Sequence, residues 1–141
     1  MRLQGKVALI TGAARGIGAE IARVFSKEGA RVAIGDVLEP EGRQTEAELK
    51  KAGGDALFVK LDVTSEQDWQ RVVKSVLDRF GRLDVLVNNA GISKRFSLEE
   101  YPVEMWDLMF AVNVKGVFLG ARTVIPIMRK QGGGCIVNMS S

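Results

Sequence analysis

The sequence predicts an open, mostly parallel, doubly wound α/β sheet with helices on both faces. Short runs rich in Val, Ile and Leu alternate with longer helical patterns along the chain, as is typical of repeated strand-helix units. The runs show little polar alternation, which indicates strands buried on both faces. The length of 141 residues fits one domain, residues 1–141, and excludes two full domains. We expect five strands in the spatial order 3-2-1-4-5.

Each expected element is marked by its composition and by the residues at its ends. The expected strands are residues 7–11, 31–36, 56–61, 83–88 and 135–140. The expected helices are residues 17–28, 39–52, 66–80 and one long helix from 102 to about 130. Gly29, Gly53 and Gly81 stand where the first three helices should stop. Pro102 suits the first turn of the long helix.

The composition excludes several kinds of catalytic and metal site. The chain has no histidine and one cysteine, so it cannot form a Ser-His-Asp triad, a Cys-His dyad, a structural zinc site or an internal disulfide by itself. We expect no metal, and we expect Cys135 to be a small buried side chain. The net charge is +3 with finely alternating signs, so we expect no nucleic-acid partner. No secretory signal and no run approaching a membrane span is visible, so we expect a cytoplasmic protein without membrane contact.

A glycine-rich segment follows the first expected strand and leads into a helix. It reads Thr11-Gly12-Ala13-Ala14-Arg15-Gly16-Ile17-Gly18, in the context that a dinucleotide site requires. Gly12 permits a tight turn, Gly16 lets backbone N–H groups approach a pyrophosphate, and Gly18 lets the helix pack on the sheet. The positive helix N-terminus favours an anion there. The spacing differs from the commoner G-x-G-x-x-G, and the alternative is a purely structural turn.

The residue that ends the second strand predicts which dinucleotide is bound. Asp36 can accept hydrogen bonds from the adenosine ribose hydroxyls and would repel a 2′-phosphate. Arg15 points the other way, since a guanidinium in the glycine loop can reach a 2′-phosphate. Because the repulsion from Asp36 acts at the 2′ position itself, we expect NAD rather than NADP. An alternative role for Asp36 is to cap the next helix, and the two roles are compatible.

Several motifs occur in a fixed order along the chain. They are Thr11-Gly12-x-x-x-Gly16-x-Gly18, Asp62-Val63, Asn88-Asn89-Ala90-Gly91, Val112-Asn113-Val114-Lys115-Gly116 and Ile136-Val137-Asn138-Met139-Ser140-Ser141. On these residues the chain resembles the short-chain dehydrogenase/reductase family over its whole length. The resemblance implies a Rossmann-like fold and an NAD(P)-dependent oxidoreductase. It also implies hydride transfer between nicotinamide and a small-molecule alcohol or ketone.

The resemblance implies cofactor-binding roles for the matched residues. These residues are Thr11, Gly12, Arg15, Gly16, Ile17, Gly18, Asp36, Asp62, Val63, Asn88, Ala90 and Gly91. Asp62 would contact the adenine amino group and Val63 would line the adenine pocket. Asn88, Ala90 and Gly91 would shape the floor beside the adenosine ribose. The alternatives are that Asp62 only caps the following helix and that Asn88 and Asn89 form a polar strand-to-loop turn.

The resemblance also implies two members of a catalytic set, Asn113 and Ser141. Asparagine is a poor helix former, and Asn113 lies inside a strongly apolar helix. In the resembling family the matching residue distorts its helix, and its main chain holds a water in a proton relay. The alternative is an ordinary helix-face Asn hydrogen-bonded to nearby backbone. Ser141 would hydrogen-bond the reacting oxygen of the substrate.

The chain departs from the family at the acid/base pair. The family has a tyrosine, with a lysine four residues later, about a dozen residues after the catalytic serine, whereas the single tyrosine here is Tyr101 and Met105 stands four residues on. Removing a positioned acid/base costs about 10²- to 10⁴-fold in rate, so we expect these 141 residues alone to be inactive. The alternative is a dinucleotide-binding module or sensor without turnover.

Crossover handedness predicts surfaces that this chain leaves uncovered. Helices after strands one and two should cover one face of the sheet, and helices after strands three and four the other. Strands four and five would then be bare on the first face, so we expect a natural protein of roughly twice this length. The helix of residues 102–130 carries more apolar side chains than one buried face requires. We expect it to form a homo-oligomer, a dimer or tetramer, as it commonly does in the resembling family; burial under further chain is the alternative.

Overall fold

A computed structural model describes all 141 residues of the chain. The strands are β1 (Val7–Thr11), β2 (Arg31–Asp36), β3 (Ala56–Lys60), β4 (Val85–Asn88) and β5 (Cys135–Asn138). The α-helices are α1 (Gly16–Lys27), α2 (Glu39–Lys51), α3 (Glu66–Phe80), α4 (Val103–Phe110) and α5 (Gly116–Gln131). A short 3₁₀ turn, η1 (Leu98–Glu100), precedes α4, and a π-helical segment, η2 (Ala111–Lys115), joins α4 to α5.

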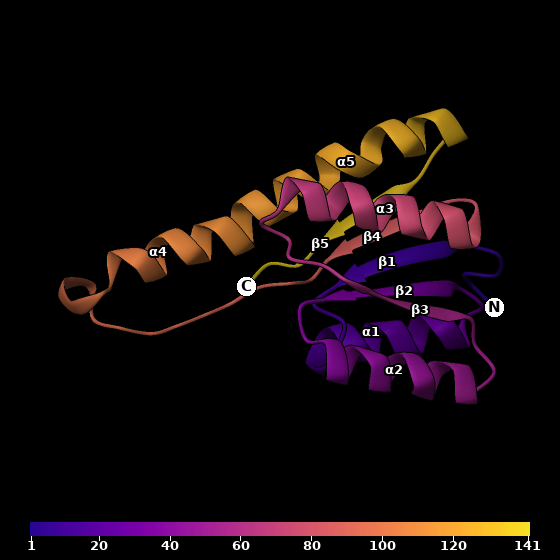
Figure 1. Ribbon diagram of the computed structural model, residues 1–141, viewed down its shortest axis with the longest axis horizontal. Coiled ribbons are helices and arrows are strands. Elements are labelled where there is room, and N and C mark those ends of the chain that lie inside the picture. Colours follow the sequence, from indigo (N-terminus) through magenta and orange to yellow (C-terminus); the bar gives the residue numbers. More distant parts are fainter.

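The strands form one parallel sheet in the order β3-β2-β1-β4-β5, which confirms the expected order. Figure 1 shows α1 and α2 on one face of this sheet and α3 and α5 on the other. Strand residues alternate between the two apolar cores. Leu9 and Leu86 lie in the core beneath α3 and α5, whereas Ile10 and Val87 lie in the core beneath α1 and α2.

The exposed part of the sheet is smaller than expected. Val87 of β4 is buried in the same cluster as Ala22 of α1, so the expectation that β4 is bare on this face is wrong because the α1 layer extends over it. The uncovered strand is β5. Its register places Val137 beside Val87 on the α1 face, where Val137 is 41% exposed. Cys135 is exposed for the same reason, which corrects the expectation that it is buried.

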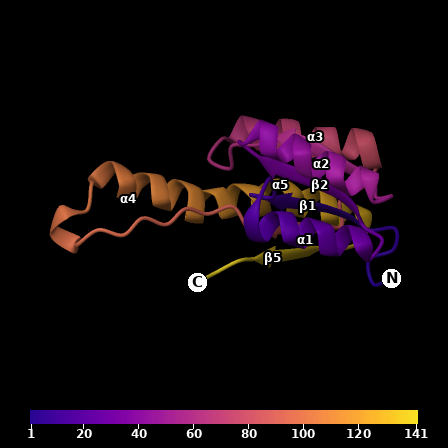
Figure 2. The same cartoon turned by 90° about the horizontal axis from the view of Figure 1, so that it is seen from below.

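The long helix is a single rod with an internal irregularity. Both views show α4, with the chain that precedes it, projecting well beyond the sheet (Figures 1 and 2). The expected helix of residues 102–130 is interrupted where the π-helical residues Ala111–Lys115 widen one turn. This irregularity contains Asn113, the residue at which the resemblance implied a distorted helix. The whole rod, Val103–Gln131, is long and apolar enough to cross a membrane. The expectation that no run approaches a span is therefore wrong by length and composition, although core helices of soluble proteins meet the same criteria.

Candidate functional site

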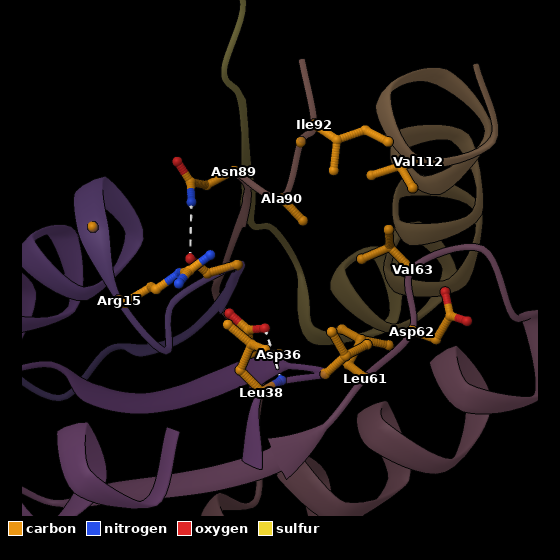
Figure 3. Close-up of a pocket in the computed structure, with 14 residues that line it drawn as sticks. Arg15, Asp36, Leu38, Leu61, Asp62, Val63, Asn89, Ala90, Ile92 and Val112 are labelled. Carbon is orange, nitrogen blue, oxygen red and sulfur yellow. Dashed lines mark hydrogen bonds between the residues drawn. The ribbon is translucent and has the colours of Figure 1, made fainter. Parts of the chain in front are cut away.

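A cleft of about 450 Å³ opens at the carboxyl ends of the central strands (Figure 3). Its walls come from the segments after β1, β2, β3 and β4 and from the π-helical segment. The lining residues are Gly12, Arg15, Gly16, Asp36, Val37, Leu38, Leu61, Asp62, Val63, Asn89, Ala90, Gly91, Ile92 and Val112. This is the edge at which doubly wound sheets bind ligands, and the volume is that of a small-molecule site.

The glycine loop forms one wall of the cleft and requires glycine at particular positions. Gly12 and Gly16 have φ values of 65° and 62°, in the left-handed region that disfavours side chains. A Cβ on Gly12 would lie 2.8 Å from the Ala90 Cα, and one on Gly18 would lie 2.2 Å from the Gly12 carbonyl oxygen. A Cβ on Gly16 would meet no atom within 4 Å. Gly12 and Gly18 therefore permit close packing, whereas Gly16 faces open space in the cleft.

Helix α1 begins at Gly16 without a capping side chain and without an acidic residue in its first turn. By contrast, α2 has Glu39 and Glu41 in its first turn, and α3 has Glu66 and Asp68. The first N–H groups of any α-helix lack partners within the helix and carry partial positive charge. The start of α1 therefore presents the cleft with uncompensated donors, which suit an anion such as a pyrophosphate.

Thr11 and Asn89 fasten the glycine loop to the segment after β4. The buried Thr11 hydroxyl accepts hydrogen bonds from the N–H groups of Asn89 (3.0 Å) and Ala90 (2.9 Å). The Asn89 side-chain amide donates to the carbonyls of Thr11 (3.1 Å) and Gly12 (3.2 Å; Figure 3). Thr11 thus lies beneath the cleft rather than in its lining. Sequence reasoning gave Asn89 no cofactor-binding role, although it stood in the same motif as Asn88, Ala90 and Gly91.

Asp36 lines the cleft directly beside the glycine loop. Its Oδ2 accepts a hydrogen bond from the Ala14 N–H at 3.0 Å. Its Oδ1 accepts one from the Leu38 N–H at 3.1 Å, which Figure 3 shows. Asp36 therefore faces the cleft and orders the backbone just before α2. It does not cap that helix, whose N-cap residue is Leu38 and which has no side-chain capping hydrogen bond. Arg15 also lines the cleft and makes no hydrogen bond or ion pair with another side chain.

Asp62 and Val63 form the wall that follows β3. The Asp62 Oδ1 accepts hydrogen bonds from the backbone N–H (2.9 Å) and hydroxyl (2.7 Å) of Thr64. Val63 is buried against α5, where a Cβ on Gly116 would lie 2.8 Å from its Cγ2. Helix α3 is capped instead by Ser65, whose hydroxyl accepts from the Asp68 N–H. Capping is therefore not the role of Asp62.

Three of the remaining expected cofactor residues lie outside the lining of the cleft. Asn88 is buried and donates from Nδ2 to the Asn138 Oδ1 at 2.9 Å, which joins β4 to β5. Gly18 is buried inside α1, and Ile17 is 68% exposed on its surface. Sequence reasoning gave no cofactor-binding role to the apolar lining residues Val37, Leu38, Leu61, Ile92 and Val112. For Val37 and Leu61 the available signal was an apolar residue directly after a buried strand.

The two expected catalytic residues stand at the rim of the cleft or beyond it. Asn113 lies in the π-helical segment, and its side-chain amide pairs with the backbone of Ile92. Ser141 is exposed, at the end of the sheet that carries the cleft (Figure 1). Tyr101 precedes α4 and packs edge to face on Phe96, with ring centroids 5.2 Å apart. No group of three or more Cys, Asp or Glu side chains gathers in a metal-binding arrangement.

Comparison with known proteins accounts for this arrangement. The model of the short chain dehydrogenase family matches residues 6–141. The chain belongs to this family. Within 99% of its length it is 47% identical to a 2,5-dichloro-2,5-cyclohexadiene-1,4-diol dehydrogenase of Sphingobium indicum, of which it covers 56%. It is 46% identical to a cyclopentanol dehydrogenase of a Comamonas species and to a 3-alpha-(or 20-beta)-hydroxysteroid dehydrogenase of Mycobacterium bovis, of which it covers 56% and 53%. The chain spans about half the length of these curated relatives.

Proposed function

We propose that this chain is the NAD(H)-binding part of an oxidoreductase of the short-chain dehydrogenase/reductase type. One observation carries the proposal: a single cleft joins the uncapped start of α1 to the Asp36 carboxylate. The helix start suits a pyrophosphate, and the carboxylate suits the adenosine ribose hydroxyls. A bound nicotinamide would supply or accept hydride, for exchange with an alcohol or carbonyl substrate. The apolar wall formed by Val63 and Leu38 suits an adenine ring.

NAD is the proposed cofactor because Asp36 carries negative charge where the adenosine 2′ position would lie. A 2′-phosphate placed there would face a carboxylate whose oxygens already accept from Ala14 and Leu38. Repulsion between the negatively charged 2′-phosphate and the Asp36 carboxylate would disfavour the binding of NADP. Arg15 lines the same cleft and is the one cation whose position favours NADP. We therefore expect NADP to bind more weakly.

Catalysis requires a proton transfer that matches the hydride transfer. In the proposed site Ser141 would orient the reacting oxygen, and Asn113 would contribute to the proton path. Within residues 1–141 no tyrosine is followed four residues later by lysine. These residues alone are therefore proposed to bind cofactor without reducing a carbonyl. The second candidate function is a dinucleotide-binding module without turnover. It rests on the same absence of a tyrosine followed four residues later by lysine within residues 1–141.

The names of the relatives suggest the substrate class. Two of them specify ring alcohols, a cyclopentanol and a cyclohexadienediol, and a third specifies a hydroxysteroid. We propose that the protein acts on a small-molecule secondary alcohol or the corresponding ketone, without nucleic-acid or membrane partners. A cytoplasmic location is proposed with it.

A fluorescence titration of the chain with NADH and NADPH tests the cofactor proposal. NADH should bind with the lower Kd, and ADP-ribose should compete with it because the proposed contacts involve its adenosine and pyrophosphate. Absence of binding by either dinucleotide would refute the proposal. Ketone reduction with NADH by the 141-residue chain would instead refute its proposed inactivity.

We also propose that the rod of α4 and α5 forms a homo-oligomer. Large apolar side chains are exposed along it, namely Val103, Trp106, Leu108, Phe110, Val114, Phe118 and Ile125. Trp106→Glu should lower the mass measured by light scattering after size exclusion. Val24→Glu, at a similarly exposed valine of α1, should leave the mass unchanged. A monomeric parent chain would contradict this proposal.

A further inference from the structure

Ala14, in the middle of the glycine loop, is held by side chains from two other elements. Its N–H donates to the Asp36 Oδ2 at 3.0 Å. Its carbonyl accepts from the Thr45 hydroxyl of α2 at 2.8 Å. Ala14 and Thr45 are both buried, so water cannot readily replace the Thr45 hydroxyl as the partner of the Ala14 carbonyl. The backbone of the loop is thus fixed at one residue from both sides.

The sequence of α2 brings the Thr45 hydroxyl to this position. Gly42, one turn earlier, lets α2 approach the sheet, because a Cβ there would lie 2.1 Å from the Phe58 ring. A helical threonine commonly donates to the carbonyl four residues earlier in its own helix. Thr45 donates across to the glycine loop instead. A valine of nearly the same shape at this position would leave the Ala14 carbonyl buried without a partner.

The same interactions determine where the Asp36 carboxylate lies. One oxygen accepts from Ala14 and the other accepts from Leu38, so the orientation of the carboxylate depends on the position of the Ala14 N–H. Each carboxylate oxygen can accept more than one hydrogen bond. Asp36 therefore retains acceptor capacity toward the cleft that it lines.

We propose that Thr45 is a positioning residue for dinucleotide selection. By holding the Ala14 carbonyl, it fixes the Ala14 N–H that orients Asp36, and so it sets the preference for NAD over NADP from outside the cleft. This inference rests on the proposed function, in which Asp36 receives the adenosine ribose. Thr45 would contact no part of the cofactor itself.

Three variants separate this role from a general effect on folding. Thr45→Val removes the hydroxyl with little change in shape, and Thr45→Ser keeps it. Thr123→Val is the matched control, because Thr123 in α5 donates only to the Leu119 carbonyl of its own helix, at 2.7 Å. Kd values for NADH and NADPH are measured by titration, and hydrogen exchange of residues 12–18 is measured without nucleotide.

Thr45→Val should weaken NADH binding about tenfold, since the lost hydrogen bond leaves a buried acceptor unpaired. NADPH binding should weaken less, because a displaced Asp36 also repels the 2′-phosphate less, so the ratio of the two Kd values should shrink. Exchange in residues 12–18 should accelerate. Thr45→Ser and Thr123→Val should keep the parent Kd ratio.

The outcomes distinguish the positioning role from the proposed function. Equal weakening of NADH and NADPH by Thr45→Val, or parent-like binding, would refute the role of Thr45 and leave the NAD(H) site intact. Failure of the parent chain to bind either dinucleotide would refute the proposed function, and the positioning role with it. In that case faster exchange in Thr45→Val would still show that the hydroxyl holds the loop.

Discussion

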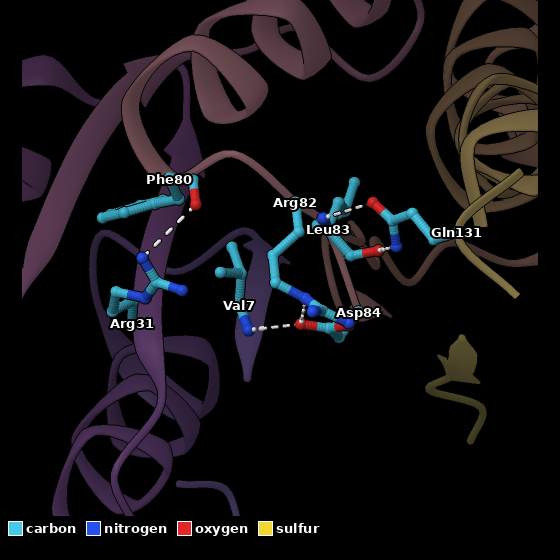
Figure 4. Close-up of polar contacts among 7 residues, drawn as sticks. All are labelled: Val7, Arg31, Phe80, Arg82, Leu83, Asp84 and Gln131. Atoms are coloured by element: carbon cyan, nitrogen blue, oxygen red, sulfur yellow. Dashed lines mark hydrogen bonds and ion pairs between the residues drawn. The ribbon is translucent and has the colours of Figure 1, made fainter. Parts of the chain in front are cut away.

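Asn113 and Ile92 are joined by two hydrogen bonds between a side-chain amide and a backbone. The Asn113 Oδ1 accepts from the Ile92 N–H at 2.9 Å, and its Nδ2 donates to the Ile92 carbonyl at 2.8 Å. Gln131, at the end of α5, makes the same pair of bonds with Leu83, at 3.0 and 2.9 Å (Figure 4). Leu83 precedes β4 and Ile92 follows it. These side-chain hydrogen bonds therefore hold the rod of α4 and α5 to the chain at both ends of β4.

Asn113→Ala and Gln131→Ala should therefore lower stability alike but affect ligand binding differently. Each removes two hydrogen bonds, so each should reduce the free energy of unfolding by about 1–2 kcal/mol in urea titrations. Ile92 lines the cleft and Leu83 does not. Asn113→Ala should weaken NADH binding several-fold, whereas Gln131→Ala should not. Equal Kd values for the two variants would show that the Asn113 pair supports only the fold.

The sheet could be predicted from the sequence because its signals are local. Runs such as Val7–Thr11 are apolar up to their last residue, and Gly81 ends α3 in the left-handed conformation that its position suggested. The π-helical segment at Asn113 shows a different case. The residue was conspicuous as an asparagine in an apolar helix, but the partner that explains it, Ile92, lies 21 residues away in the chain. The hydrophobic periodicity of the sequence does not reveal a pairing between residues so far apart in the chain.

The site residues that could be predicted from the sequence are glycines and charged residues at recognisable positions. Residues whose role depends on tertiary packing were missed. Gly12 lines the cleft as its place in the glycine-rich segment suggested, and Asp36 does so as its place at the end of the second strand suggested. Thr45 gave no signal, because a threonine within a helix is compatible with many roles. The burial of Val87 was also missed, because crossover handedness assigns helices to faces and does not say how far each helix extends over neighbouring strands.

Gly16→Ala should weaken NADH binding at least about tenfold, because the added methyl group projects into the space expected for the pyrophosphate. The φ of 62° at Gly16 adds strain to any such change. Gly81→Ala controls for that strain, since Gly81 has a φ of 80°, faces open space and lies far from the cleft. Both variants should lose similar thermal stability, and only Gly16→Ala should lose affinity. Unchanged affinity in a folded Gly16→Ala would contradict the pyrophosphate assignment.

Asp36→Asn should narrow the difference in affinity between NADH and NADPH by about tenfold or more, since charged hydrogen bonds contribute about 1.5–3 kcal/mol. The amide keeps the size of the side chain and one acceptor oxygen, so it separates the effect of charge from that of shape. Asp36→Ala should narrow the difference as well and should also loosen the loop, because Ala14 and Leu38 lose their acceptor. Titrations of both variants with both dinucleotides give the result. Tighter binding of NADPH than NADH by the unmodified chain would show that Arg15 governs the site.

Asp84 joins the beginnings of β4 and β1 on the side of the sheet away from the cleft. Its buried carboxylate accepts from the Val7 N–H at 2.9 Å and from two nitrogens of the Arg82 guanidinium (Figure 4). Burial by itself raises the pKa of Asp84, but the hydrogen bonds from Arg82 and Val7, with the Arg82 charge, outweigh it. The net effect holds the pKa below its ordinary value. The charged form is therefore the one that the fold stabilises.

A lowered pKa in the folded state means that Asp84 stabilises the fold above its unfolded pKa of about 3.9 and loses this contribution as the pH falls through the folded value. Asp84→Asn should thus reduce the free energy of unfolding by about 1–3 kcal/mol at pH 7, with the difference shrinking steadily below about pH 4. Asp78→Asn is the matched control, because Asp78 forms an exposed ion pair with Lys74 at 2.7 Å and such pairs contribute about 0–1 kcal/mol. Urea titrations from pH 7 down to about pH 3 measure both variants. A deficit in Asp84→Asn that stayed constant as the parent was acidified would show that Asp84 acts through shape alone, because only the charged carboxylate is lost on protonation.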